Sequence, residues 1–292
     1  MVLIIRKLFY TTLTTFIIIA ILTLINFKNN TLRTNLELDN TINMKTNSIY
    51  LLNEDNYLTK VDVFVEKDKP IDQVKNIIRY LKEDNKKIES TYKGYIPNNT
   101  KIIELYIKEN ILYLNLSDEF LKGNLDIMIP GLIRSILDIK SIKKVDLKVM
   151  GNYIDNYDYL LDDKIPINTR YNINNRKNIK EVLLYYLSKD NNYIPVSEYV
   201  NDDREKIEII IDELKGNNDG KLISYLNSNT KLIDYNEEND ILFLNFNNYL
   251  KDDKKVLNYN LNEIAYSVFE NYNVSSVMFK INDDNLKIIH KK

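Results

Sequence analysis

The feature of this sequence that most limits its fold is an internal repeat. Four blocks of residues occur twice in the same order, 130 to 133 residues apart. NTKII at 99–103 returns as NTKLI at 229–233, and ILYLNL at 111–116 returns as ILFLNF at 241–246. A third block at 142–149 matches 274–281, and an apolar stripe beginning at Val74 matches one beginning at Ile207. Recurrence in order indicates that one domain has been duplicated.

Each copy predicts the same succession of elements. Apolar residues at i, i+3, i+4 and i+7 predict two helices per copy, each with one apolar face. Short alternating runs predict the strands. The predicted strands are 61–66, 101–107, 111–116 and 144–149 in the first copy, and 182–187, 231–235, 241–246 and 276–281 in the second. The helix stripes are Val74, Ile77, Ile78, Leu81 and Ile129, Leu132, Ile133, Ile136, Leu137, then Ile207, Ile210, Ile211, Leu214 and Leu261, Ile264, Ala265, Val268, Phe269.

The order β-α-β-β-α-β with amphipathic helices predicts an α+β fold. Each copy would form two layers, with both helices on one face of a small mixed sheet. Pro70 fits the first turn of the first helix, and Asp202 or Asp203 is the expected N-cap in the second copy. Residues 192–200 are interpreted as an insertion in the second copy that forms an extra edge strand, where Pro195 is tolerated.

The N-terminal segment predicts a membrane anchor. Residues 8–27 carry no charge, and 20 helical residues span about 30 Å, the thickness of the hydrocarbon core. Arg6 and Lys7 favour a cytoplasmic position for residues 1–7, and a cleavage site is absent, which indicates an uncleaved signal anchor. We therefore expect a stalk at 28–57, a first domain at 58–150, a linker or long loop at 151–180 and a second domain at 181–292.

Composition excludes several functions. The formal net charge is −2, so the chain lacks the basic field expected of a nucleic-acid-binding protein. Cysteine is absent and histidine occurs once, which excludes thiolate catalysis and His/Cys metal clusters. We expect no cofactor, no metal and no catalytic residue.

The repeat resembles the GerMN domain of bacterial sporulation and germination proteins over about residues 58–292. The first copy carries the motifs I-P-x-x-T-K at 96–101, N-L-S at 115–117 with Phe120, Val145 with Gly151, and P-I-x-x-R at 166–170. The second copy carries Y-I-P-V at 193–196, L-K-G at 214–216 and N-T-K at 229–231. The first copy lacks a counterpart of Y-I-P-V, and the second lacks P-I-x-x-R.

The resemblance implies an envelope protein of endospore-forming bacteria that acts between the mother-cell and forespore membranes. The family has no established catalytic residues. The resemblance therefore implies a single-pass membrane protein. Its C-terminal domains would be extracytoplasmic and non-catalytic and would serve as a scaffold or localisation module. The expected partners are other envelope proteins, with self-association through exposed strand edges as one route.

Few residues are candidates for chemistry. His290 lies third from the end, where chains usually fray, which argues against a catalytic triad. Asp118 and Glu119 could form a carboxylate pair for acid–base work on glycan, but Ser117 is interpreted as the cap of the second helix, with the two acids at its positive end. In the second copy the equivalents of Ser117 and Asp118 are Asn247 and Asn248, which keep capping ability and lose acidity.

Other polar and aromatic clusters favour surface roles. Asp pairs at 162–163, 202–203, 252–253 and 283–284 lack the calcium-loop pattern and are interpreted as turns. Lys143 and Lys144 are interpreted as solvent contacts flanking a strand. Tyrosines gather in two places, Tyr153, Tyr157 and Tyr159, and Tyr185, Tyr186 and Tyr193. Such surfaces favour an alternative function, a peptidoglycan-binding module. A wall enzyme that uses Asp118 is the third hypothesis.

Overall fold

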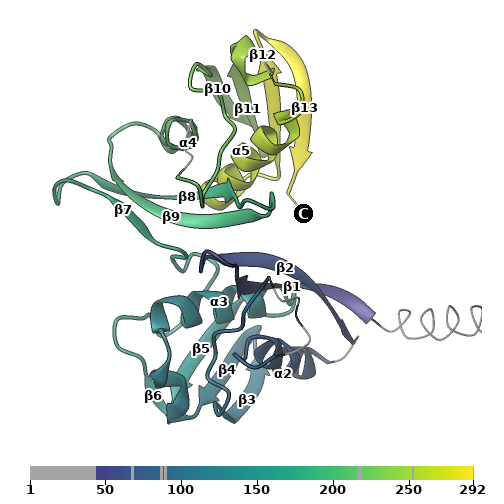
Figure 1. Cartoon of the computed structure of the whole chain (residues 1–292), viewed down its shortest axis with the longest axis vertical. Helices are drawn as coiled ribbons and strands as arrows, with labels where there is room; N and C mark the ends of the chain where they lie inside the picture. Colours follow the sequence, from purple (N-terminus) through teal and green to yellow (C-terminus); the bar gives the residue numbers. More distant parts are fainter. Residues whose placement is uncertain are drawn as a thin grey trace, which may run out of the picture. The chain divides into compact units, whose positions relative to one another are not determined.

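The computed structural model describes residues 44–66, 69–85, 88, 91–215, 219–251 and 253–291 (Figure 1). The predicted anchor at 8–27, residues 1–7 and the first part of the predicted stalk lie outside these residues. Among the described residues, no helix is long and apolar enough to cross a membrane. Asn47–Val63 and the residues from Lys69 onward form one compact unit, and this unit contains both repeats.

The first repeat combines a hairpin, a four-stranded sheet and two helices. In the sheet the strand order is β3-β4-β5-β6, with β4 and β5 parallel and the outer pairs antiparallel. Strands β1 and β2 form a separate two-stranded sheet. The elements are β1 Met44–Leu52, β2 Leu58–Glu66, α2 Pro70–Tyr80, β3 Ile102–Lys108, β4 Ile111–Leu116, η1 Asp118–Lys122, α3 Leu125–Leu137, β5 Lys144–Val149 and β6 Asn152–Tyr153.

The second repeat follows the same plan. Its four-stranded sheet has the order β10-β11-β12-β13, and its hairpin sheet has the order β7-β9-β8. The elements are β7 Arg170–Asn172, β8 Ile179–Leu187, β9 Tyr193–Asn201, α4 Lys206–Leu214, β10 Leu232–Glu238, β11 Ile241–Phe246, η2 Asn248–Lys251, α5 Leu257–Asn271, β12 Ser276–Ile281 and β13 Asp284–His290.

The predicted helix stripes and central strands form the two cores. Leu112, Leu114 and Leu116 alternate along β4 and are buried, as β4 presents one face to the helices. Ile129 and Leu132 of α3 belong to the same apolar cluster. A second cluster unites the buried side of β11 with the stripe of α5. The predicted α+β architecture of tandem two-layer domains is therefore confirmed.

The hairpin that opens each repeat corrects two interpretations of the sequence. Strands β1 and β2 correspond to β8 and β9 with the same offset of 135 residues at both ends. Residues 44–57 were expected to belong to the stalk, but they form β1 and its turn, and Ile49 and Leu51 are fully buried. Residues 192–200 are not an insertion, since β2 of the first repeat is their counterpart.

The two hairpin turns are built in the same way from different residues. The side chain of Asn53 accepts hydrogen bonds from the backbone amides two and four residues later, at 3.1 and 2.9 Å. Ser188 occupies the equivalent position, and its hydroxyl accepts the same two bonds at 3.2 and 3.1 Å. Both turns also place an asparagine at positive φ, Asn56 and Asn191. Side-chain acceptors of either type support such turns, which explains why the correspondence is weak in the sequence.

Strand β9 is central rather than at an edge. It pairs with β8 along its whole length and with β7 over 198–200. Pro195 lies opposite Tyr185 and outside the stretch that pairs with β7, so its missing N–H leaves the β7–β9 pairing intact. Residues 151–180 are a structured loop that contains β6 and β7, with Ile165 and Ile167 buried.

The helix caps differ from those expected. Helix α3 is capped by Asn124, whose side chain accepts from the amide of Asp126. Glu205 precedes α4 and forms a capping box with Glu208, so neither Asp202 nor Asp203 is the cap. Ser117 precedes the short helix η1 and makes no capping bond there.

Candidate functional site

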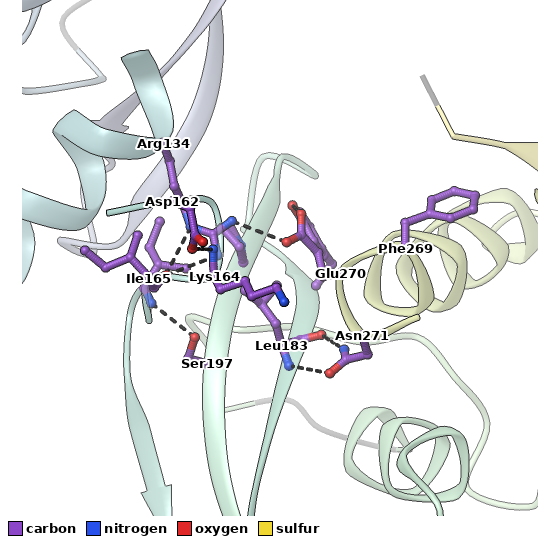
Figure 2. Close-up of polar contacts among 12 residues, drawn as sticks. Arg134, Asp162, Lys164, Ile165, Leu183, Ser197, Phe269, Glu270 and Asn271 are labelled. Atoms are coloured by element: carbon purple, nitrogen blue, oxygen red, sulfur yellow. Dashed lines mark hydrogen bonds and ion pairs between the residues drawn. The ribbon is translucent and has the colours of Figure 1, made fainter. Parts of the chain in front are cut away.

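A buried arginine links the two repeats. Arg134 lies on α3, and its side chain is 4% exposed. Nε and Nη2 donate to the carbonyl of Ile165 at 3.4 and 3.2 Å, and Nη1 lies 3.4 Å from Oε2 of Glu270 on α5 of the second repeat. Figure 2 shows Arg134 pointing from the first repeat toward this carboxylate. The ion pair therefore joins α3 to α5 through two residues that are 136 positions apart in the chain.

The electrostatics of the pair keep the arginine charged. Burial alone would lower the pKa of Arg134, but Glu270, Tyr50 and Tyr185 together outweigh it, and the pKa is raised. Glu270 also accepts from the hydroxyl of Tyr185 at 3.2 Å. Beside it, the amide of Asn271 bonds both the N–H and the carbonyl of Leu183, at 3.3 and 2.8 Å (Figure 2). The end of α5 is thus fixed to β8.

Apolar packing continues across the same junction. Leu183 and Tyr185 of β8 belong to the apolar cluster of the first repeat, although the strand is part of the second. Tyr266 of α5 packs edge-on against Tyr185 and Tyr193, with ring centroids 5.6 and 4.9 Å apart. Aromatic pairs of this geometry add about 0.5–1.5 kcal/mol to area burial. Two side chains of the second repeat therefore lie in the core of the first.

The P-I-x-x-R segment forms a third link. Ile167 exchanges two bonds with Ser197 of β9, one from its amide to the hydroxyl at 3.1 Å and one from the Ser197 amide at 2.8 Å. Asn168, at a φ of 49°, accepts from the Leu58 amide and donates to the carbonyls of Leu58 and Pro195. One side chain thus bridges β2 and β9. The motif is the connection between the repeats.

A cleft of about 870 Å³ opens beside this connection. Residues of both repeats and of the connecting loop line it. The lining includes four tyrosines and four aspartates: Tyr57, Tyr157, Tyr171 and Tyr199, with Asp126, Asp155, Asp158 and Asp162. The rings of Tyr171 and Tyr199 stack with centroids 5.2 Å apart, and Tyr171 is 71% exposed. The volume lies in the range of sites that bind ligands or side chains of partners.

Two tyrosines of the cleft, Tyr157 and Tyr199, offer hydrogen bonding. Burial, followed by the nearby Asp126 carboxylate, raises the pKa of Tyr157 to about 12, and its hydroxyl donates to Asp126 at 3.2 Å. Burial, followed by Glu181, raises the pKa of Tyr199 to about 12. Both phenols therefore stay protonated near neutral pH and act as donors and acceptors.

Ser117, which precedes Asp118 and Glu119, makes a hydrogen bond that recurs in the second repeat. Ser117 accepts a hydrogen bond from the amide of Lys101 at 2.9 Å, and Asn247 accepts the equivalent bond from Lys231 at 3.1 Å. This shared bond, not helix capping, is what the two residues have in common. A hydrogen bond from Ser117 lowers the pKa of Glu119, which is opposite to what a general acid needs at neutral pH.

Of the remaining candidates, Asp162 and Tyr157 line the cleft. His290 is not at a frayed end, because it belongs to β13 and its Nδ1 lies 2.8 Å from the Ser276 hydroxyl. Ser276 is only 5% exposed and His290 is exposed, so the pair links β12 and β13 at the surface. Within the described ranges, no three His, Asp or Glu side chains are grouped closely enough to hold a metal ion. Lys143 and Lys144 lie exposed at the start of β5, with both amides bonded to the carbonyl of Asn110.

The two tyrosine clusters separate in the structure. Tyr157 lines the cleft, whereas Tyr153 and Tyr159 pack together with centroids 4.5 Å apart. Tyr185 and Tyr193 contribute to the junction through Tyr266. Sequence reasoning missed Arg134 and Glu270 altogether. The only signal for Arg134 was a single charge inside the apolar run of α3.

Comparison with known proteins gives the fold a family. The sequence matches the Germane family, described as sporulation and spore germination, over residues 48–155 and 183–287. Among curated proteins no match is found.

The fold also matches a solved structure of tandem GerMN domains. The tandem GerMN domains of the sporulation protein GerM from Bacillus subtilis superpose with a TM-score of 0.73 at 19% identity, over 85% of this chain and 97% of that one. The first GerMN domain of the same protein matches with a TM-score of 0.33 at 18% identity, over 38% of this chain and 86% of that one. With two family matches that cover more than two thirds of its length, this chain belongs to the Germane family as a protein of two tandem GerMN domains.

Proposed function

We propose that this protein is a non-catalytic binding module of the envelope of a spore-forming bacterium. Its two GerMN domains act as one rigid body that associates with other envelope proteins. The observation that carries the proposal is the junction: a buried ion pair, two side chains of the second repeat in the core of the first and the bridge through Asn168 fix one repeat on the other. A rigid pair presents surfaces that neither repeat forms alone.

The cleft at the junction is the surface best suited to a partner. Tyrosine is enriched at protein interfaces because it contributes a large apolar ring and a hydrogen-bonding hydroxyl. Tyr171 offers an exposed ring, and Tyr157 and Tyr199 offer protonated hydroxyls. Arg170 adds a guanidinium whose Nη1 is buried and makes no hydrogen bond within the described part of the chain, so a partner or a water would satisfy it.

The sequence and the family support a location for this module outside the cytoplasm. Residues 8–27 would anchor the protein in the membrane once, with the domains outside the cytoplasm. In a spore former this places the domains between the mother-cell and forespore membranes. Membership of a sporulation and germination family supports that place of action.

Site-specific crosslinking in sporulating cells tests the proposal. A photoreactive amino acid is introduced at Tyr171 in the cleft and, as a matched control, at Tyr106, an exposed tyrosine of β3 in the first repeat. We expect Tyr171 to yield discrete adducts with one or a few envelope proteins, identified by mass spectrometry, and Tyr106 to yield none of these. Equal labelling at both positions, or no protein adduct at Tyr171 in cells that make normal spores, would contradict the role of the cleft.

A further inference from the structure

The second repeat contains a small pocket whose lining differs from the equivalent residues of the first repeat. The pocket measures about 180 Å³ and is lined chiefly by Tyr225, Asn227, Tyr249, Asp253 and Asn260. It lies at the start of α5, away from the cleft at the junction, since the two sets of lining residues share no member. Its origin can be followed by comparing equivalent positions in the two repeats.

In the first repeat the tyrosine equivalent to Tyr225 is turned inward. Tyr95 is 6% exposed, and its hydroxyl donates to the carbonyl of Tyr50 at 3.0 Å. The ring lies over Gly131 of α3, where an added Cβ would come within 2.2 Å of the hydroxyl oxygen. Tyr95 can therefore be buried only because residue 131 has no side chain.

The second repeat has the opposite arrangement. The offsets of the repeat place Glu263 at the position of Gly131, and Tyr225 at the position of Tyr95. Glu263 is fully buried, and Tyr225 is 40% exposed. The side chain of Glu263 takes the space that the tyrosine hydroxyl needs, so Tyr225 turns outward and packs near Tyr259, with ring centroids 6.3 Å apart.

A buried polar atom of the second repeat, Oδ1 of Asn260, lies beside the pocket without a hydrogen-bond partner among the described residues. Asn260 is 4% exposed, and its Oδ1 makes no hydrogen bond within the described residues. Met128 occupies the equivalent position in the first repeat and is fully buried. A buried acceptor without a donor costs about 1–3 kcal/mol, so an amide here is costly unless something outside the chain supplies the donor. Asn260 lines the pocket, and its Oδ1, which is buried, would meet a ligand once the side chain turns toward the pocket.

We infer that this pocket binds a single neutral sugar unit, such as an N-acetylhexosamine at the end of a cell-wall glycan. Tyr225 and Tyr249, 40% and 45% exposed, offer ring faces for the apolar face of a pyranose. Asn227, Asp253 and Asn260 supply acceptors for hydroxyl or acetamido donors. Among the described residues that line the pocket none is a cation, which disfavours phosphate-rich and other anionic ligands.

The size of the pocket limits the ligand. A volume of 180 Å³ holds about six waters at about 30 Å³ each, which suits one ring rather than a chain of sugars. The inference goes beyond the proposed protein association and does not depend on it. It gives the peptidoglycan-binding alternative a specific place in the second repeat.

Binding is tested with the purified full chain and defined sugars. N-acetylglucosamine and glucose are used as soluble probes in saturation-transfer NMR, and purified sacculi in co-sedimentation. The variant Asn260→Met installs the residue of the first repeat, and Tyr225→Ala removes a ring from the rim. Tyr106→Ala, on the sheet of the first repeat, is the matched control. We expect N-acetylglucosamine to bind wild type and Tyr106→Ala equally, and affinity to fall about tenfold or more in Asn260→Met, as lost hydrogen bonding to a buried group predicts.

The outcomes separate the possibilities. Sacculus binding that is lost in Asn260→Met identifies the glycan as the source of the sugar, whereas binding of free sugar alone identifies a small soluble ligand of the same chemistry. Asn260→Met should also unfold at the same or a higher temperature than wild type, so loss of binding would not reflect misfolding. Absence of any sugar signal with wild type, or an unchanged signal in both Asn260→Met and Tyr225→Ala, would overturn the inference and leave a water-filled hollow.

Discussion

Replacing Glu270 by alanine should destabilise the protein far more than replacing Arg134 by methionine. In Glu270→Ala the guanidinium stays buried, at 4% exposure, with the carbonyl of Ile165 as its described acceptor. Removing one member of a buried pair costs about 3–5 kcal/mol, and we expect about 3 kcal/mol here because Glu270 itself is 28% exposed. In Arg134→Met an apolar side chain fills the space, and Glu270 retains solvent and the hydroxyl of Tyr185, so we expect about 1 kcal/mol.

A double-mutant cycle measures the asymmetry. Urea unfolding of the purified protein, followed by circular dichroism, gives the free energy of unfolding of each variant by linear extrapolation. The double variant should unfold nearly like Arg134→Met alone, which corresponds to a coupling of about 3 kcal/mol between the two sites. Lys75→Ala is the control, because it breaks an exposed pair with Asp72 that is worth less than about 1 kcal/mol. Equal costs for the two single variants, or a coupling below about 0.5 kcal/mol, would refute the reasoning.

Three further predictions concern the helices that close each repeat. Gly131→Ala should displace Tyr95 and cost about 1–3 kcal/mol of stability, despite the better helix propensity of alanine. Urea unfolding measures this loss, and increased solvent quenching of tyrosine fluorescence reports the displaced ring. Burial raises the pKa of Glu263 to about 8 from an ordinary value of 4.5, so the free energy of unfolding should be highest below about pH 4.5 and should fall as pH rises to about 8. Glu263→Gln should remove about 2–4 kcal/mol of this fall between pH 5 and 8. An unchanged dependence of the free energy of unfolding on pH would count against the assignment. Ser267→Ala should cost about 1–3 kcal/mol by leaving the buried amide of Tyr185 without its acceptor at 2.9 Å, and a loss below about 0.3 kcal/mol would mean that water replaces the hydroxyl.

The parts of the fold that could be predicted are those encoded by local spacing. The stripe of α5 and the alternation of β11 are complete within 15 and 6 residues, so the sequence is sufficient to identify them. Strand β1 was missed because its first half is polar and its apolar residues, such as Ile49 and Leu51, are few. Its counterpart β8 is almost wholly apolar, so the two strands do not resemble each other in sequence.

The junction could not be predicted because its residues depend on the other repeat. Arg134 occupies the fourth position from the end of an apolar helix, where a charged side chain ordinarily faces solvent. Arg134 is buried because α5 and the carbonyl of Ile165 lie against it, and no local pattern in the sequence encodes these contacts. The P-I-x-x-R motif did mark the connecting segment, but its role as the bridge between β2 and β9 depends on the side chain of Asn168, one of the unspecified positions of the motif.

The hairpin that opens each repeat determines where the protein can be cut. A fragment that begins at residue 58 would keep every block of the recognisable repeat, yet it would lack β1. The apolar surface that receives Ile49 and Leu51 would then be exposed, and the hydroxyl of Ser135 would lose the amide of Tyr50 that it binds at 2.8 Å. Shortened forms of this protein, and of relatives whose domains are delimited by sequence similarity alone, should therefore begin at or before β1 if they are to stay soluble.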